Sequence, residues 1–149
     1  MTLKERLHAH LLGLLQTQLN NLHTLHQQLS QESTETGKGS AGDKHEVGIA
    51  MAQIELEKLA KQVQLIEQQL VQLKRLDPAM PCTQIQMGAL WQSAGRLYYA
   101  AVAVGQLEFE GKAVFCLSAE APVFQALRLK KQHDNVLFNG STWLIESVD

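Results

Sequence analysis

The chain has 149 residues, of which 45% are apolar, 19% charged and 5% aromatic, and its formal net charge is −2. This composition excludes wholesale disorder, and the charge argues against nucleic-acid binding through bulk electrostatics. No window reaches the roughly 18 uncharged apolar residues of a membrane span, and the N-terminus lacks a signal-peptide pattern. Cys82 and Cys116 give neither a metal spacing nor a disulfide framework, so we expect reduced thiols in the cytoplasm and no membrane partner.

The first 76 residues differ from the rest of the chain. They contain 16 Leu and 11 Gln but no aromatic residue and no proline. Leucines recur at helical spacing, and their stripe shifts by one residue near Leu14, as it does at a stutter. The polar segment 32–42, with three glycines, is where we expect the chain to reverse. The leucines form three stripes: Leu7, Leu11 and Leu14; Leu15, Leu19 and Leu22; and Leu22, Leu25 and Leu29.

The clearest pattern is an apolar heptad repeat, with alternating steps of three and four residues. A helix with so narrow an apolar stripe needs a partner to bury it. We therefore predict an antiparallel helical hairpin, a coiled coil, from residues 3–35 and 44–76, with Leu59 and Val63 buried in its seam. The repeat consists of Ile49, Ala52, Leu56, Leu59, Val63, Ile66, Leu70 and Leu73.

The remainder of the chain has the composition of strands and turns. Residues 97–104 and 112–117 are rich in β-branched and aromatic side chains, and Asn139-Gly140 favours a type I′ turn between two further strands. Pro122 suits the first turn of a short helix. The predicted class is α+β, with a helical hairpin at 1–76, a proline-containing linker at 77–84, and a small antiparallel β domain with one helix at 85–149.

Two motifs resemble binding sites without their usual context. Residues 37–42 match the glycine spacing of a dinucleotide-binding loop, but a Leu/Gln-rich helix precedes them instead of a strand, which favours a flexible turn. His23 and His26 lie one helical turn apart, yet no cysteine or carboxylate stands at ligand spacing. Exposed helix surface is therefore favoured over a metal site, and spacing alone indicates no catalytic site.

Asp43 and Glu46 begin the second helix, and two compatible interpretations stay open. Asp is a good N-cap, an acidic residue three positions later completes a capping box, and negative charge stabilises a first helical turn. The functional interpretation is that two carboxylates at the apex of a hairpin reach another protein's cavity and supply oxygen ligands to Mg²⁺.

Two stretches of the chain resemble the Gre family of bacterial transcript-cleavage factors. The first is Gly42-Asp43-Lys44-His45-Glu46, because the family places Gly-Asp-x-x-Glu at its hairpin tip. The second runs from Ser118 through Pro122 to Lys131, and is similar to a run in the family's FKBP-like C-terminal domain. Leu129 stands where the family usually has glycine, and Val47-Gly48-Ile49-Ala50 replaces the usual Asn-Ala-Glu-Tyr.

The resemblance implies a factor that docks on RNA polymerase through its C-terminal domain. Its hairpin would enter the secondary channel, where Asp43 and Glu46 would help hold Mg²⁺ shared with the polymerase and orient water near backtracked nascent RNA. The chain would then modulate another enzyme without being one, and would bind no cofactor alone. Related family members inhibit the polymerase, and the sequence does not separate inhibition from stimulation. A protein-interaction or chaperone module, built on the same coiled coil and FKBP-like domain, is the rival interpretation.

Overall fold

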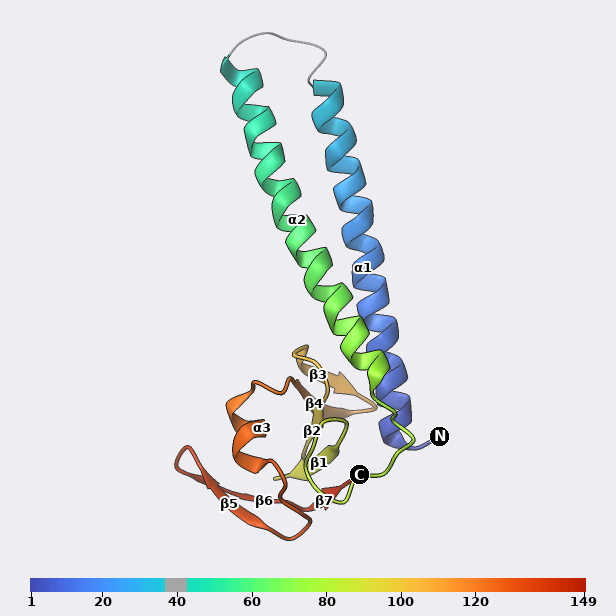
Figure 1. Ribbon diagram of the computed structural model, residues 1–149, viewed down its shortest axis with the longest axis vertical. Helices are drawn as coiled ribbons and strands as arrows, with labels where there is room; N and C mark the ends of the chain where they lie inside the picture. The colour runs from blue at the N-terminus through green and yellow to red at the C-terminus, as the bar shows by residue number, and fades with distance from the viewer. Residues whose placement is uncertain (37–42) are drawn as a thin grey trace. The chain divides into compact units, whose positions relative to one another are not determined.

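The computed structural model describes the backbone of residues 1–36 and 43–149 and the side chains of residues 1–32 and 46–149. Two long helices, α1 (Leu3–Thr36) and α2 (Asp43–Arg75), pack together and precede a small β-rich domain with one short helix (Figure 1). The predicted α+β class is confirmed. The expected reversal and the glycine motif at 37–42 lie outside the described residues. In the described part of the chain, no helix combines the length and apolarity needed to cross a membrane.

The chain divides into two compact units. One unit contains Met1–Leu12 together with Val71–Asp149, and the other is Gly13–Leu70. The first turns of α1 and the last turn of α2 therefore belong to the same compact unit as the β strands. The sequence pattern, in contrast, had indicated a helical hairpin followed along the chain by a separate β domain.

In the Gly13–Leu70 unit, the apolar heptad of α2 forms the less exposed face of the helix. Ile66 and Leu70 are buried, whereas Leu59 and Val63 are only half-buried, so the prediction that the latter two are buried is wrong. A pair of helices leaves the flanks of each seam residue open to solvent, which explains the partial burial. Burial thus decreases along the seam from Leu70 towards Ile49.

On α1 the inward-facing positions confirm the stutter but correct one stripe. Leu11, Leu15 and Leu19 follow one another in two steps of four, which is the shift that the leucine pattern predicted. Leu25 is 51% exposed, and the half-buried His26 occupies the next seam position instead. The third leucine stripe is therefore wrong at Leu25, because the heptad step after Leu22 is four residues and not three.

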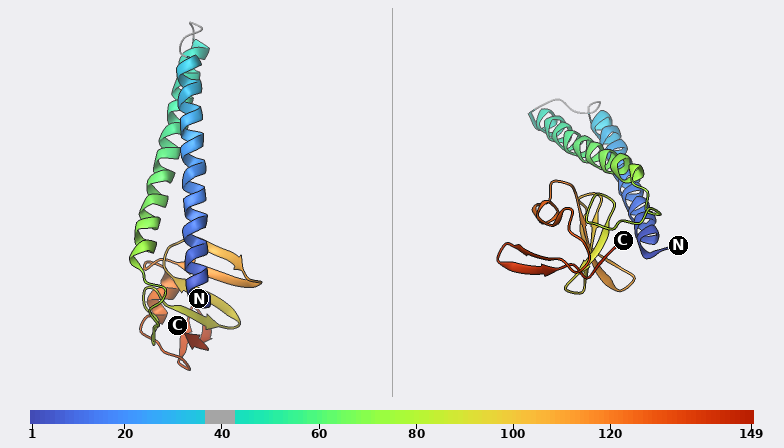
Figure 2. Two further views of the ribbon diagram at one scale, coloured as in Figure 1. Left: turned by 90° about the vertical axis from the view of Figure 1, so that its right-hand side faces the viewer. Right: turned by 60° about the horizontal axis from the view of Figure 1, so that its bottom comes forward.

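The β-rich part, in the other unit, is built on a five-stranded sheet in the order β3-β4-β2-β1-β7. A separate two-stranded ribbon, β5–β6, lies beside the short helix α3 (Pro122–Leu127), as Figure 2 shows. The strands are β1 (Leu90–Ser93), β2 (Arg96–Ala100), β3 (Gly105–Phe109), β4 (Lys112–Leu117), β5 (Asn135–Phe138), β6 (Ser141–Leu144) and β7 (Ser147–Val148).

The five-stranded sheet is not wholly antiparallel as predicted, because β2 and β4 run parallel. Residues 101–104 carry the chain past one strand position, so that β3 forms the edge and β4 returns between β3 and β2. All other strand pairs are antiparallel. The sequence indicated the strands but not their order in the sheet. The reason is that β2 pairs with β4, although β3 lies between them in the chain.

Both local turn predictions are confirmed. Asn139 and Gly140 have φ angles of 52° and 79°, the positive pair that a type I′ turn requires, and they join β5 to β6. Pro122 is the first residue of α3, where its missing N–H costs no intrahelical hydrogen bond.

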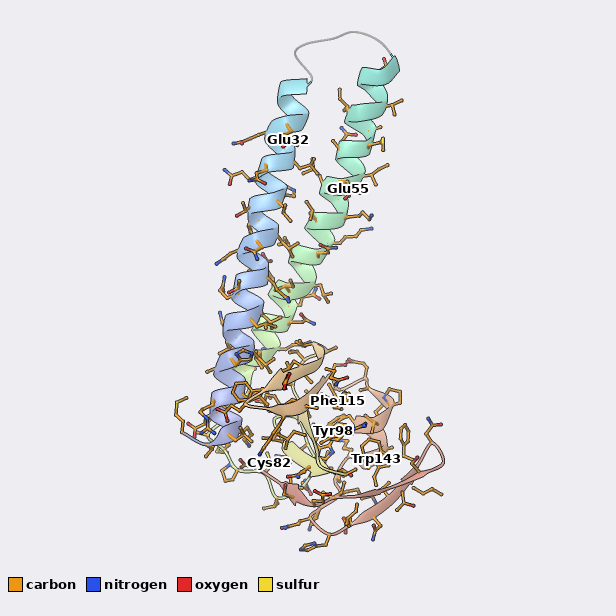
Figure 3. All side chains as sticks on the ribbon, turned by 180° about the vertical axis from the view of Figure 1, so that it is seen from behind. Glu32, Glu55, Cys82, Tyr98, Phe115 and Trp143 are labelled. Atoms are coloured by element: carbon orange, nitrogen blue, oxygen red, sulfur yellow. The ribbon has the colours of Figure 1, made fainter. Side chains whose placement is uncertain are left out.

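The two faces of β2 are covered by different layers. Successive side chains of a strand point to opposite faces, so Tyr98 and Tyr99 separate. Tyr98 stacks on Trp91 and Phe115, with ring centroids 5.5 and 5.2 Å away, and meets Trp143 edge-on; Figure 3 labels Tyr98, Phe115 and Trp143. Tyr99 has no exposed surface and faces His8 of α1. Because both faces are covered, four of the five residues of β2 are buried.

The first turns of α1 pack within this unit through apolar and polar contacts. Leu7 and Leu11 have no exposed surface, and the Arg6 guanidinium donates two hydrogen bonds, of 2.8 and 3.1 Å, to the Glu110 carboxylate. The His10 ring lies 5.0 Å from the Phe109 ring, centroid to centroid. The β3–β4 hairpin is thereby fastened to the start of α1.

Candidate functional site

The predicted tip acids occupy the start of α2. Asp43 is the first residue of the helix, and Glu46 lies in its first turn with an exposed side chain. The side chain of Asp43 lies outside the described part of the structure. The distance between the Asp43 and Glu46 carboxylates is therefore not described either. A helix N-terminus presents free N–H groups and a partial positive charge, which stabilise nearby carboxylates. This placement is compatible with both capping and metal binding.

His23 and His26 lie one turn apart on α1 but differ in their exposure to solvent. His23 is exposed, and its Nε2 lies 3.9 Å from Glu67 Oε1 across the seam. His26 is half-buried at a seam position. Among the described residues, no group of three or more His, Cys, Asp or Glu side chains is arranged to hold a metal ion.

An exposed apolar stripe adjoins Glu46 on α2, on the face away from the seam. Val47, Met51 and Ile54 are 56, 63 and 58% exposed. Their spacing of four and then three residues places them on one helical face. Sequence reasoning missed this stripe because it followed the stronger heptad of the seam, although the same spacing rule identifies it. Contiguous exposed apolar residues are typical of interaction surfaces.

A pocket of about 590 Å³ lies against α3 in the β-rich unit. The buried Phe124 contributes an apolar wall, and Met87 and Leu129 are 37 and 56% exposed. The guanidinium-bearing Arg128 also lines the pocket, and Lys130 and Lys131 follow it in the chain. None of these three cations forms an ion pair with a described residue. The remaining lining residues are Gln86, Ala119 and Gln125.

The backbone at the end of α3 is unusual for its residue. Leu129 has a φ of +69°, a left-handed conformation that favours glycine. Its N–H donates to the Ile85 carbonyl at 2.8 Å, and the Ile85 N–H donates to the Lys130 carbonyl at 2.8 Å. These two hydrogen bonds hold the conformation and bring the 85–87 segment beside α3. The pocket therefore depends on a pairing between segments more than forty residues apart.

The polar side chain of His8, on α1, is buried in the β-rich unit, which the sequence did not predict. His8 is 5% exposed, and its Nδ1 is 2.7 Å from the Tyr99 hydroxyl. Burial lowers the pKa of His8, and the charge of Asp77 offsets part of that effect. Burial also raises the pKa of Tyr99. The neutral forms are therefore favoured at both positions, as a hydrogen bond between uncharged groups requires.

No protein family, curated protein or solved structure matches this chain.

Proposed function

We propose that this protein is a cytoplasmic accessory factor of RNA polymerase that modulates cleavage of backtracked nascent RNA. The observation that carries the proposal is the position of Glu46, exposed in the first turn of a helix that begins at Asp43. The same acids complete the Gly-Asp-x-x-Glu pattern by which the chain resembles the Gre family. The arrangement of a helical hairpin followed by a β-rich domain agrees with that resemblance.

In this proposal the tip acids only supply oxygen ligands to a metal ion. In a two-metal site, a weakly held second Mg²⁺ stabilises the attacking and leaving oxygens and needs oxygen ligands. Asp43 and Glu46 would supply carboxylate oxygens to that ion, while the polymerase supplies the principal metal site. An exposed carboxylate such as that of Glu46 binds an ion without a change in internal packing. The chain is then an activator or inhibitor of another enzyme.

The pocket beside α3 is the surface that we assign to docking. Its apolar wall at Phe124 suits an apolar anchor residue, and the Arg128 guanidinium, which forms no ion pair with a described residue, favours an acidic neighbour on the partner. An acidic segment of the polymerase with one apolar anchor has the matching chemistry. The pocket and the start of α2 consist of different residues, so the docking role and the metal role can be tested separately.

The central experiment replaces both tip acids by asparagine. Asp43→Asn/Glu46→Asn removes the charges, while Asn at 43 keeps its capping ability. We expect normal folding and unchanged polymerase binding, with a cleavage effect reduced about tenfold or more at limiting Mg²⁺. The assay follows RNA cleavage in a stalled elongation complex across a Mg²⁺ titration. Glu55→Gln/Glu57→Gln is the matched control, because both side chains are exposed carboxylates of α2 beyond its first turn.

The outcomes separate the alternatives. Loss of the effect with binding retained supports metal delivery. If wild type does not stimulate cleavage but slows elongation, the chain is an inhibitor of the polymerase. If the double variant only melts earlier and otherwise behaves as wild type, the acids are caps and the metal role is wrong.

Docking has its own test. Arg128→Glu reverses one unpaired charge at the pocket, and Lys112→Glu on β4 reverses an exposed charge elsewhere on the β-rich unit. We expect the first variant to weaken binding to core polymerase about tenfold and the second to leave it nearly unchanged. Equal effects of both variants would place docking on another surface.

The exposed stripe on α2 favours a second candidate, a protein-interaction module that acts without the polymerase. Val47, Met51 and Ile54 give α2 a second apolar face that the hairpin seam does not use. This candidate predicts that the purified chain self-associates and that Met51→Lys makes it monomeric, as measured by light scattering. It also predicts that the chain does not capture core polymerase, whereas the first proposal requires that it does.

A further inference from the structure

Lys4 is buried beside a cysteine, which is an unusual place for a lysine. Its side chain is 1% exposed, and Nζ donates a 2.7 Å hydrogen bond to the Met80 carbonyl. The only acidic group near it in the described chain is Asp149, at 3.7 Å, and that carboxylate is 46% exposed. Lysines are almost never fully buried unless paired, because the ammonium ion loses its hydration. This weak compensation indicates that the position has a use beyond packing.

The sulfur of Cys82 is the second group at this site. Lys4 Nζ lies 4.0 Å from Cys82 Sγ, and Gln86 Nε2 lies 3.5 Å from the same sulfur. Two nitrogen donors from different segments thus converge on one thiol, which retains 8% exposure. Figure 3 labels Cys82 in the segment that precedes β1.

Cys116 provides an internal comparison. It is 1% exposed, lies on β4, and has no nitrogen donor to its sulfur in the described structure. Burial raises the pKa of the Cys116 thiol to about 12, so it stays protonated and unreactive at neutral pH. Of the two cysteines, only Cys82 combines residual exposure with an adjacent amine.

We propose that Lys4 and Cys82 form an oxidation-induced covalent crosslink, a sulfenamide, when the protein meets hydrogen peroxide. In the first step the Cys82 thiolate attacks one peroxide oxygen, the O–O bond breaks, and the departing hydroxide takes the proton of the new S–OH group and leaves as water. The sulfur is oxidised by two electrons to sulfenate, the conjugate base of sulfenic acid, and the peroxide is reduced. Gln86 Nε2 is placed to hydrogen-bond the new oxygen.

In the second step the Lys4 amine, after transferring one proton to the sulfenate oxygen, attacks the sulfur. The S–N bond forms, the S–O bond breaks, and the leaving oxygen takes a second proton from nitrogen and departs as water. No further electrons are exchanged. The flexible four-carbon stem of lysine closes the remaining distance once its hydrogen bond to Met80 is released. A thiol reductant reverses the crosslink.

The crosslink would join the first turn of α1 to the segment before β1, closing a loop between positions 78 residues apart. A covalent link across so long a loop restricts the unfolded chain strongly. Oxidation would therefore fix the start of α1 to the β-rich unit and raise the melting temperature of that unit. This effect does not depend on polymerase binding, so it can be tested whether or not the proposed function is correct.

The experiment treats full-length Cys116→Ser protein with hydrogen peroxide, a background in which no intramolecular disulfide can form. We expect a product about 2 Da lighter than the reduced chain, reversed by dithiothreitol. After trypsin, residues 1–6 should be joined to residues 76–96, because no cleavage site interrupts the second peptide. The melting temperature should rise by several degrees on oxidation.

Two variants make the assignment specific. Cys82→Ser should abolish both the mass change and the thermal shift. Lys4→Arg keeps a cation but removes the primary amine, and should leave Cys82 sulfenic acid free to react with dimedone. A wild-type product about 32 Da heavier, with Cys82 as sulfinic acid and unlinked Lys4, would overturn the proposal. So would complete resistance of Cys82 to peroxide in the folded wild-type protein, and that result needs no variant to fold.

Discussion

Replacing Leu129 by glycine should stabilise this protein, although it removes a large apolar side chain. A left-handed conformation costs an ordinary L-residue about 1–2 kcal/mol, and Leu129 holds a φ of +69°. Glycine relieves that strain but gives back about 0.5–1 kcal/mol through the greater freedom of the unfolded chain. The Leu129 side chain is 56% exposed, so little burial is lost. The net expectation is a gain of about 0.5–1 kcal/mol.

Leu129→Ala is the necessary control, because alanine removes most of the side chain but keeps the strained φ. The glycine variant should therefore melt about 1–4 °C above the alanine variant in thermal unfolding followed by circular dichroism. Urea unfolding should show the same order with unchanged slopes. If the two variants are equally stable, the strain at 129 does not exceed the cost of glycine's freedom in the unfolded chain, and the predicted stabilisation is wrong.

The same variant separates stability from docking. Leu129 lines the pocket beside α3, so Leu129→Gly should bind core polymerase more weakly than wild type while unfolding at a higher temperature. A variant that is both more stable and better at binding would remove Leu129 from the docking surface.

Three further predictions concern stability. Leu15→Ala, at 1% exposure, should cost about 2–4 kcal/mol in urea unfolding, whereas Leu25→Ala, at 51% exposure, should stay within about 0.5 kcal/mol. Leu59→Ala should lie between them, at about 1–2 kcal/mol, since its side chain is half-buried. His8 has a lowered pKa when folded, so the unfolded chain takes up its proton first; stability should fall as pH falls below about 6.5 and continue falling until the folded His8 is protonated. His8→Gln should flatten that slope, and an unchanged slope would contradict the assignment.

Periodic and turn signals in the sequence predicted much of the architecture. The heptad from Ile49 to Leu73 identified the inner face of α2, and Asn139-Gly140 and Pro122 identified a turn type and a helix start. Each of these signals is local, because spacing and backbone preference act within a few residues. The parallel pairing of β2 with β4 was not predictable in this way, since it depends on the path of the chain through residues 101–104.

The candidate sites likewise divide into features with a local sequence signal and features that depend on long-range pairing. Asp43 and Glu46 are visible as a capping pattern within four residues. The pocket beside α3 requires Ile85 to pair with Leu129 and Lys130, which no local pattern indicates. The burial of Lys4 and His8 was not predicted, because a charged or polar residue among leucines ordinarily marks the exposed face of a helix. Here Lys4 donates to the Met80 carbonyl and His8 meets the Tyr99 hydroxyl, and both partners follow much later in the chain.

The decline in burial along the seam has a consequence for local opening within the Gly13–Leu70 unit. Amide protons near Leu15, Ile66 and Leu70 should exchange with solvent deuterium slowly, because exposing them breaks a well-buried cluster. Those near Leu29 and Ile49 should exchange much faster, since their side chains are only half-buried and opening there exposes little new apolar surface. If Asp43 and Glu46 bind an ion as proposed, local opening at this end of α2 would leave the more buried part of the hairpin folded.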